Sequence, residues 1–389
     1  MGTISPDFDR SARTAALISA EDEAIAAASN IARMIGSNGE NAGEGPGGPF
    51  EFLTRSGLYG ISVPSEYGGL DASNTVLADV CAILSEASPA LAEMVASHFM
   101  VIECLRSYGT EAQKTYFFPA TLSGLRFART LPYDMDMEPG RPVLVSNGIG
   151  WRINGRSGCT PAAHHAEWLF LSAHRESGQP AALLVPVRAE GAIYVANGSP
   201  SDGRWQPDAE QVLFRDLNAE GDGLLQPSFD PRKQDVPQAL NLLLQSAIQL
   251  GIGRGALRRA LGYFPDPQTE TQDTSSTAVG AVSVRLTAAE AVIEKAGKAV
   301  DAAQIGLADT HRRFAMMTAA AADITAMEAA AEAQDLLAAA TGAKPFTHTF
   351  TRIPARTMPV LSPDDVDALL QTTGRYRATK NDETDEERP

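Results

Sequence analysis

The chain has 389 residues, of which 44% are hydrophobic, and a formal net charge of −16. This length allows two or three compact domains or lobes. The acidic balance disfavours nucleic acid and anionic membranes as partners, because general electrostatic binding to either requires a basic surface. Three scattered cysteines, Cys81, Cys104 and Cys159, show no Cys-x-x-Cys spacing, which fits a reducing compartment and argues against a disulfide framework.

The first twenty residues carry Asp7, Asp9 and Arg10 and no continuous apolar run, so we expect no secretory signal. No segment reads as long and apolar enough to span a bilayer. The sequence therefore predicts a soluble cytoplasmic protein with no membrane and no nucleic acid among its partners.

The N-terminal third has a helical pattern. An Ala-rich helix is predicted over 11–35, a Gly/Asn/Pro-rich loop over 36–48, and a second helix from near Pro49. Apolar residues at helical spacing predict a third helix over 74–87, and Ser88-Pro89 interrupts the pattern.

The next helix carries an apolar stripe that includes His98 and ends at Tyr108-Gly109. Thr110 and Gln113 then form a capping-box arrangement, in which the hydroxyl and the side-chain amide satisfy free amides at the start of a helix. The first lobe is therefore predicted to be helical throughout.

Between about 125 and 230 the pattern changes to short β-type runs separated by Asn-Gly, Ser-Gly and Pro turns. A small β domain is the natural interpretation. The runs are Val143–Val145, Trp151–Ile153, Trp168–Leu171 and Ala181–Val187.

Helical pattern returns at 236–261 and again after a polar loop that reaches about 276. Large residues then recur every seven positions with alanines between them, which lets helices approach closely, as in a four-helix bundle. A last Ala-rich helix is predicted over 316–341. The seam consists of Leu286, Ile293, Val300 and Leu307 with Ala289, Ala296 and Ala303.

The predicted fold class is mainly α with a small central β domain. We expect an N-terminal helical domain over 1–124, a barrel-like β domain over 125–232, a C-terminal helical bundle over 233–373, and a charged, disordered tail over 374–389.

This order resembles the acyl-CoA dehydrogenase superfamily over roughly residues 10–345. The stretch Ser56–Gly124, which opens with Val63–Leu70 (VPSEYGGL) and continues through the helices above, resembles the N-terminal helical domain of that family. Residues 247–263 and 166–171 resemble the start of its bundle and a strand of its β domain. The resemblance implies a flavin, FMN or FAD, held between the helices and the β domain.

His98 is the sharpest catalytic candidate, because its place on an apolar stripe turns a proton-carrying imidazole toward the interior. The alternative is a core histidine bonded to a backbone carbonyl. In the reduced-flavin-dependent monooxygenases that share this fold, including those that act on dibenzothiophene and dimethyl sulfone, the resemblance implies a histidine of this helix beside the flavin. There it would assist oxygen activation.

Two turns are expected to line the flavin. Dehydrogenases usually carry Trp-Ile-Thr where this chain has Cys159-Thr160-Pro161, so the aromatic group is missing while Thr160 and Ser157 still offer hydroxyls. The segment Phe127–Pro132 falls where the family has Thr-Glu-Pro and then Gly-Ser-Asp. Thr130 and Pro132 match that pattern, whereas its acidic residue and Gly-Ser-Asp turn are absent.

Near the C-terminus, Ala355-Arg356-Thr357 resembles the Asn-Ala-Arg-Thr pattern of the monooxygenases, whose later histidine falls at Leu361. The resemblance implies that Arg356 meets a flavin phosphate, and the alternative is a surface or bundle salt bridge. No residue aligns with the catalytic glutamate of the dehydrogenases, which counts against simple acyl-CoA oxidation.

Two other motifs are interpreted structurally. Gly251–Ala256 matches a loose dinucleotide pattern but lies inside a helical run, so small residues for helix packing explain it better. His164, His165 and Glu167, with His174 further on, show no ligand spacing, and we predict no metal site.

The leading hypothesis is a flavin-dependent oxidoreductase, a two-component monooxygenase that uses reduced flavin from a separate reductase and O2 on a small organic substrate, assembled as a homotetramer. One alternative is an FAD-dependent acyl-CoA dehydrogenase. Another is a divergent, non-catalytic scaffold member of the family, which the altered flavin-contact turns motivate.

Overall fold

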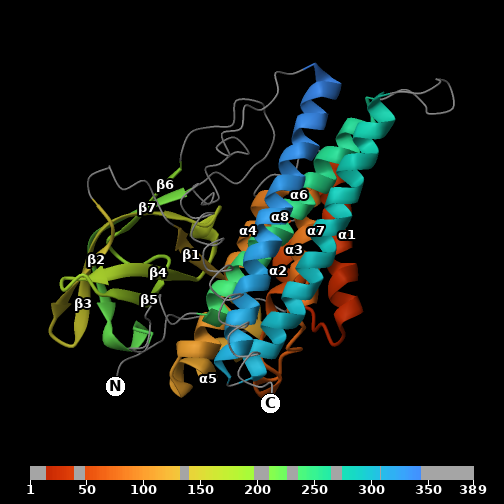
Figure 1. The fold of residues 1–389 in the computed structure, drawn as a ribbon. Coiled ribbons are helices and arrows are strands. Elements are labelled where there is room, and N and C mark those ends of the chain that lie inside the picture. The colour runs from red at the N-terminus through yellow and green to blue at the C-terminus, as the bar shows by residue number, and fades with distance from the viewer. Residues whose placement is uncertain are drawn as a thin grey trace, which may run out of the picture. The chain divides into compact units, whose positions relative to one another are not determined.

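The computed structural model of the chain describes residues 15–38, 49–131, 140–196, 210–225, 235–263, 274–306 and 308–342 (Figure 1). Within these limits the chain divides into two compact units, one over 15–72 and 87–237 and the other over 73–86 and 238–342. The first unit contains the whole sheet and the second is helical. A mainly helical chain with a central sheet confirms the predicted fold class.

The helices of the first unit are α1 (Glu21–Asn38), α2 (Pro49–Arg55), α4 (Pro89–Tyr108) and α5 (Glu111–Leu122), with short 3-10 turns η2 (Leu58–Gly60) and η3 (Ser65–Tyr67). Two of them begin at identifiable capping residues. The Ser88 hydroxyl accepts a hydrogen bond from the Leu91 N–H at the start of α4, and Thr110 and Gln113 form the predicted capping box of α5.

The predicted limits of the first helix, 11–35, were wrong at both ends. Helix α1 begins at Glu21, because Glu21, Asp22 and Glu23 place negative charge at its N-terminus, where it is stabilising. It continues past the predicted stop at Gly36 to Asn38, because a single glycine costs a helix only about 1 kcal/mol and does not end it.

The sheet has seven strands in the order β1-β4-β2-β3-β7-β6, with β5 paired to β4. Strand β1 also pairs with β3, so four strands close on one another. β1 and β2 run parallel to β4, and the other pairs are antiparallel. The strands are β1 (Phe127–Leu131), β2 (Val143–Asn147), β3 (Gly150–Cys159), β4 (Trp168–Arg175), β5 (Pro180–Pro186), β6 (Ala192–Ala196) and β7 (Glu210–Glu220).

Alternation along the strands gives the first unit two cores. In β4, Leu169 and Leu171 point into the core between the strands, while Trp168 and Phe170 point into a second core against α4 and α5. The second core includes Phe117 and other aromatic side chains. Helix α4 is thereby packed directly on β1.

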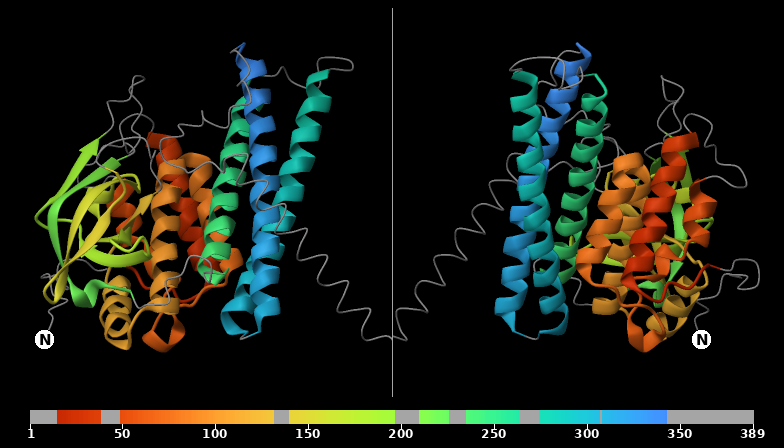
Figure 2. Two further views of the ribbon diagram at one scale, coloured as in Figure 1. Left: turned by 60° about the vertical axis from the view of Figure 1, so that its left-hand side comes forward. Right: turned by 90° about the vertical axis from the view of Figure 1, so that its right-hand side faces the viewer.

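The second unit contains α3 (Asn74–Ala87), α6 (Asp235–Leu261), α7 (Thr274–Ile305) and α8 (Asp309–Thr341). Helices α6, α7 and α8 run side by side (Figures 1 and 2). The predicted seam is confirmed at six of its seven positions, all buried, and the seventh, Leu307, lies outside the described residues.

Glycines explain how closely α6 packs on its neighbours. A Cβ at Gly251 would lie 2.2 Å from the Ala82 carbonyl oxygen of α3, and one at Gly253 would lie 2.7 Å from a Leu286 methyl group of α7. The Gly251–Ala256 motif is therefore a helix-packing feature inside α6, as predicted.

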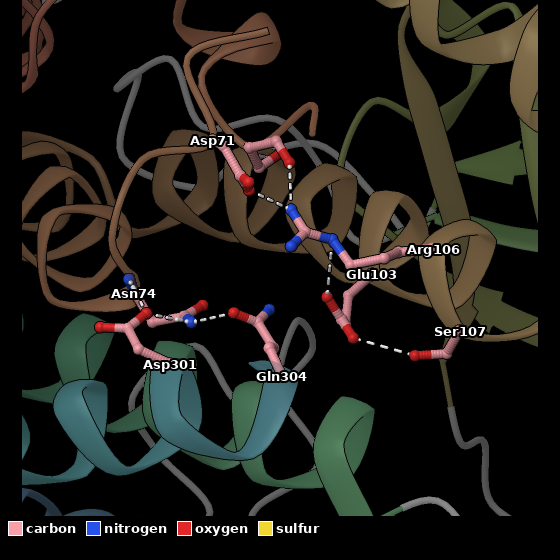
Figure 3. A network of polar contacts seen from close by, with 8 residues as sticks. Asp71, Asn74, Glu103, Arg106, Ser107, Asp301 and Gln304 are labelled. Carbon is pink, nitrogen blue, oxygen red and sulfur yellow. Dashed lines mark hydrogen bonds and ion pairs between the residues drawn. The ribbon is translucent and has the colours of Figure 1, made fainter. Parts of the chain in front are cut away.

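Each unit has a polar network of its own (Figure 3). In the first, Arg106 bonds Asp71 and lies 3.6 Å from a carboxylate oxygen of Glu103. In the second, the Asp301 carboxylate of α7 accepts hydrogen bonds from both the backbone N–H (2.8 Å) and the side chain (2.6 Å) of Asn74, so that α7 caps the start of α3.

One helical segment, Ser276–Ile305 within α7, is long and apolar enough to cross a membrane by length and composition alone. Its mean hydropathy reaches 1.3 because alanine and valine are frequent, and 22% of it is buried. This corrects the expectation that no segment meets that criterion.

Candidate functional site

The predicted site residues of the first unit converge on one strand, β1. His98 binds the start of β1, Thr160 its middle and Ser157 its end, and Thr130 belongs to the strand itself. Strand β1 lies between β3 and β4, and its pairing with β4 stops at Arg129, opposite Phe170. The candidate site therefore lies around the carboxyl end of β1.

Thr160 follows β3 directly and forms a closed set of hydrogen bonds with Arg129. Its hydroxyl accepts from the Arg129 N–H (3.0 Å) and donates to the Arg129 carbonyl (3.1 Å), which also accepts from the Thr160 N–H (3.0 Å). The side chain is buried. The hydroxyl is thus held in one orientation by the strand beside it.

Thr130 and Ser157 are held in a similar way. The Thr130 hydroxyl accepts from the Ser172 N–H (2.8 Å) and donates to the Phe170 carbonyl (3.4 Å), which extends the β1–β4 contact where the backbone pairing ends. The Ser157 hydroxyl donates to the Leu131 carbonyl (2.9 Å). Both hydroxyls keep a lone pair that these bonds do not use.

His98 of α4 is fully buried with both ring nitrogens bonded to backbone. The Phe127 N–H donates to Nδ1 (3.1 Å), so the ring proton lies on Nε2, which donates to the Tyr59 carbonyl (3.0 Å). The Tyr59 ring lies 4.6 Å from the imidazole. This geometry matches the alternative interpretation of a backbone-bonded core histidine.

Burial lowers the pKa of His98 to about 3, although the hydrogen bond to Tyr59 opposes the shift. The imidazole is therefore neutral at physiological pH. To hold or pass a proton to a bound molecule, it must first release one of its two backbone partners. The catalytic role of His98 stays a prediction, with that requirement attached.

Arg356, the predicted phosphate contact, lies outside the described residues, as do Leu361 and the charged tail. Cys159, at the position of the missing aromatic group, is buried in the core between the strands. Within the part of the chain that the structure describes, no group of three or more His, Cys, Asp or Glu side chains could hold a metal ion.

Sequence reasoning missed a charged cluster beside β1. Arg129 sends its side chain to α4, where Nε donates to the Ser97 hydroxyl (3.0 Å) and Nη2 meets the Glu93 carboxylate (3.4 Å). Glu93 is 1% exposed and Arg129 14%. An arginine inside the run Phe127–Leu131 was the available signal, but its partner lies 36 residues away.

A cavity of about 470 Å³ opens elsewhere on the sheet. It lies five residues along β3 from Cys159, about 16 Å at the rise of a strand, so it is separate from the site at β1. Its lining is Gly140, Arg141, Val143, Asn154, Gly155 and His174.

Residues 24–125 match the family described as "Acyl-CoA dehydrogenase, N-terminal domain". The curated relatives include acyl-CoA dehydrogenase FadE12 of Mycobacterium tuberculosis, 27% identical over 239 residues, which cover 58% of this chain. The chain spans about 59% of the length of that relative.

Several solved structures share the whole fold. Dibenzothiophene monooxygenase TdsC from Paenibacillus sp. A11-2, solved as a complex with FMN and indole, has a TM-score of 0.77 at 21% identity, over 92% of this chain and 97% of that one. Methanesulfinate monooxygenase MsuC from Pseudomonas fluorescens has a TM-score of 0.74 at 20% identity, over 94% and 98%. A nitrososynthase from Micromonospora carbonacea var. africana has 0.76 at 22% identity, over 92% and 98%.

These comparisons confirm the predicted resemblance. Residues 24–125 match the N-terminal domain of acyl-CoA dehydrogenases, and the chain has the acyl-CoA dehydrogenase fold, which the solved flavin-dependent monooxygenases share.

Proposed function

We propose that this chain is a flavin-dependent oxidoreductase that acts as the oxygenase of a two-component monooxygenase. It takes reduced flavin from a separate reductase and uses O2 to oxidise a small organic substrate. The fold supports this proposal, because solved structures similar over nine-tenths of the chain include monooxygenases and an FMN complex.

The observation that carries the proposal is the convergence of Thr130, Ser157 and Thr160 on the carboxyl end of β1. These hydroxyls fit the polar edge of a flavin, because each is held by backbone and keeps a lone pair that can accept from the ring N–H. When bound, the flavin would supply the oxygen chemistry.

The protein's own residues supply binding and orientation. Thr130, Ser157 and Thr160 hold the polar edge of the flavin, and Arg356 is proposed to meet its phosphate. His98 acts as a positioning residue in this proposal, because its bonds to Phe127 and Tyr59 fix the start of β1. The apolar cores on both faces of the sheet limit access of water to this region.

Flavin binding is the first test. Ligand at a hundredfold excess over its Kd stabilises a protein by about 2.7 kcal/mol, so FMN or FAD should raise the Tm. We expect reduced flavin under anaerobic conditions to raise it more than oxidised flavin. If neither flavin in either state changes the Tm, the enzymatic proposals fail and a non-catalytic scaffold role is supported instead.

The reaction itself is tested with chemically reduced flavin and ¹⁸O-labelled O2, using indole as the probe substrate. We expect one labelled oxygen atom in the product and none from labelled water. Two outcomes would contradict a monooxygenase, provided that flavin binds. In one, the product carries oxygen from water only. In the other, a panel of small aromatic and sulfur compounds gives no oxygenated product.

A second candidate function is FAD-dependent acyl-CoA dehydrogenation. The match of residues 24–125 and the similarity to FadE12 favour it. It predicts tightly retained FAD and bleaching of the yellow protein by an acyl-CoA without O2. A monooxygenase that receives reduced flavin from a reductase shows no such bleaching, so this single anaerobic titration separates the two functions.

The proposed partner of this chain is a separate flavin reductase, and its proposed assembly is a homotetramer. Helix α7 supports self-association, because an 18-residue apolar window within its segment Ser276–Ile305 is only 22% buried. Light scattering after size exclusion tests it. A mass near four chains supports the tetramer and a mass near one chain contradicts it.

A further inference from the structure

Arg129 has a backbone that is fixed by hydrogen bonds and a guanidinium group in which only some of the N–H donors have partners. Its N–H and carbonyl are both bonded to Thr160, so the residue is anchored to the proposed flavin-lining turn. Its side chain lies on α4 against Ser97 and Glu93, both buried. Arg129 is thus held at its backbone by Thr160 and at its guanidinium by α4.

One edge of this guanidinium remains open. Nε and Nη2 are occupied by Ser97 and Glu93, whereas Nη1 has no hydrogen-bond partner among the residues that the structure describes. The Arg129 side chain is 14% exposed, and Nη1 is not among the buried polar atoms that lack a hydrogen-bond partner. Arg129 therefore offers two oriented N–H donors to a molecule outside the protein.

A buried ion pair is weak evidence of stabilisation, since removing both charges from water costs about as much as their attraction returns. Glu93 of α4 and Arg129 of β1 are 36 residues apart in sequence yet meet beside the proposed site. A carboxylate that holds one edge of a guanidinium leaves the other edge rigid and well aligned for an oxyanion, which matches guanidinium geometry better than it matches an ammonium group.

We propose that Arg129 is a specificity-determining residue that binds an oxyanion of the small substrate, a carboxylate or a sulfur oxyanion, through Nη1. This inference deepens the proposed function and rests on it, because it concerns the small organic substrate of that reaction. Glu93 and Ser97 are the positioning residues. The substrate class is then a small organic acid.

The test is calorimetric titration with two matched pairs, benzoate against benzamide and acetate against acetamide, at constant ionic strength. Within each pair shape is kept and charge is removed. We expect the native protein to bind at least one carboxylate tenfold or more tightly than its amide. Arg129→Leu removes that preference, and Arg129→Lys restores part of it. Equal affinities in both pairs for the native protein would overturn the proposal.

Glu93→Gln is expected to change the preference for carboxylate over amide in the opposite direction from Arg129→Leu. It removes the neutralising charge while it keeps a hydrogen-bond acceptor for Nη2, so the carboxylate preference should increase severalfold. A purely structural ion pair predicts no increase, and a decrease overturns the proposal. Arg152→Leu, an exposed arginine on β3, is the matched control and should keep the native preference.

Two further measurements separate carboxylate binding at Arg129 from flavin binding. The titrations are run with and without FMN, so failure of flavin binding, which tests the proposed function, is recorded apart from failure of carboxylate binding. The ratio of Kd for oxidised and reduced FMN is also compared between native protein and Arg129→Leu. If Arg129→Leu leaves the ratio of the two Kd values unchanged, a substrate contact is supported. If the variant loses the preference for reduced FMN but keeps the preference for carboxylates, Arg129 is assigned to the flavin and the proposal is overturned.

Discussion

The hydroxyl of Thr160 accepts a hydrogen bond from the Arg129 N–H and donates one to the Arg129 carbonyl. One side chain at the end of β3 thereby satisfies both backbone groups of the central residue of β1. This pairing fixes the middle of β1. Thr130 and Ser157 bind backbone just beyond it, toward the carboxyl end of the strand. The proposed flavin site depends on that rigidity.

Thr160→Val keeps the shape of the side chain and removes its hydroxyl. It leaves the Arg129 N–H without an acceptor, so we expect a loss of about 1–3 kcal/mol in the free energy of unfolding and at least tenfold weaker FMN binding. Denaturant unfolding and an FMN titration measure the two effects.

The control for that variant is Thr121→Val on α5. The Thr121 hydroxyl is buried and has no hydrogen-bond partner within the described part of the chain. Its removal breaks no hydrogen bond, so it should not destabilise the protein and should leave FMN binding intact. Equal effects of the two variants would show that the Thr160 bonds have no special role.

His98→Ala removes both backbone bonds of the imidazole, so the Phe127 N–H and the Tyr59 carbonyl lose their partners inside a core. We expect a loss of about 2–4 kcal/mol. Because burial lowers the pKa of His98 to about 3, protonation is disfavoured in the folded state. The stability from neutral His98 is therefore complete above pH 6.5 and is lost as the pH falls toward 3.

The low pKa of His98 also predicts how the activity depends on pH. As a positioning residue, His98 should contribute no ionisation to the activity profile between pH 5 and 8. A kinetic pKa in that range that disappears in a folded His98→Gln variant would show that the imidazole passes protons, as the sequence first suggested.

Asp323 in α8 gives the opposite pH dependence. It is 4% exposed, and burial raises the pKa of its carboxyl to about 7 from an ordinary 3.8. The folded state therefore holds a proton that the unfolded state releases, and stability is lost as the pH rises from about 4 to above 7. Three pKa units correspond to about 4 kcal/mol.

Asp323→Asn should remove this loss. The variant is expected to be more stable than the native protein at pH 8 and similar to it near pH 4, measured by denaturant unfolding at each pH. Parallel pH curves for the two proteins would mean that Asp323 ionises normally.

Gly251→Ala tests the contact of α6 with α3. Its new Cβ would fall 2.2 Å from the Ala82 carbonyl oxygen, so the helices must separate, at a cost of about 1–3 kcal/mol. Gly280→Ala on α7 is the control, since nothing lies within 4 Å of that Cβ. It should stabilise the helix by up to about 1 kcal/mol. A Gly251→Ala variant as stable as the control would contradict the close packing.

Local signals in the sequence predicted much of the fold. The capping box at Thr110 and the seam of α7 depend on neighbours within one or two turns, and the structure has the capping box and the six described seam residues. Contacts between distant segments were not predictable. The closure of β1 on β3 and the capping of α3 by Asp301 join residues separated by 27 and more positions, and no local pattern specifies them.

The candidate site was predictable by residue but not by arrangement. Thr130, Ser157 and Thr160 were found through a resemblance, which gives positions without partners. The attachment of Ser157 and Thr160 to β1 depends on the register between β1 and β3, and the contact of Thr130 with β4 depends on the pairing of β1 with β4. The pair of Arg129 and Glu93 needed both the strand and α4 in place before it could be seen.

The most direct test of the central claim is amide hydrogen exchange of the native protein with and without saturating FMN. We predict that FMN slows exchange in 127–131 and 157–160, at the carboxyl end of β1 and the end of β3, and leaves β6 unchanged. Protection confined to other segments, or no change anywhere at saturating FMN, would contradict a flavin site at this end of β1.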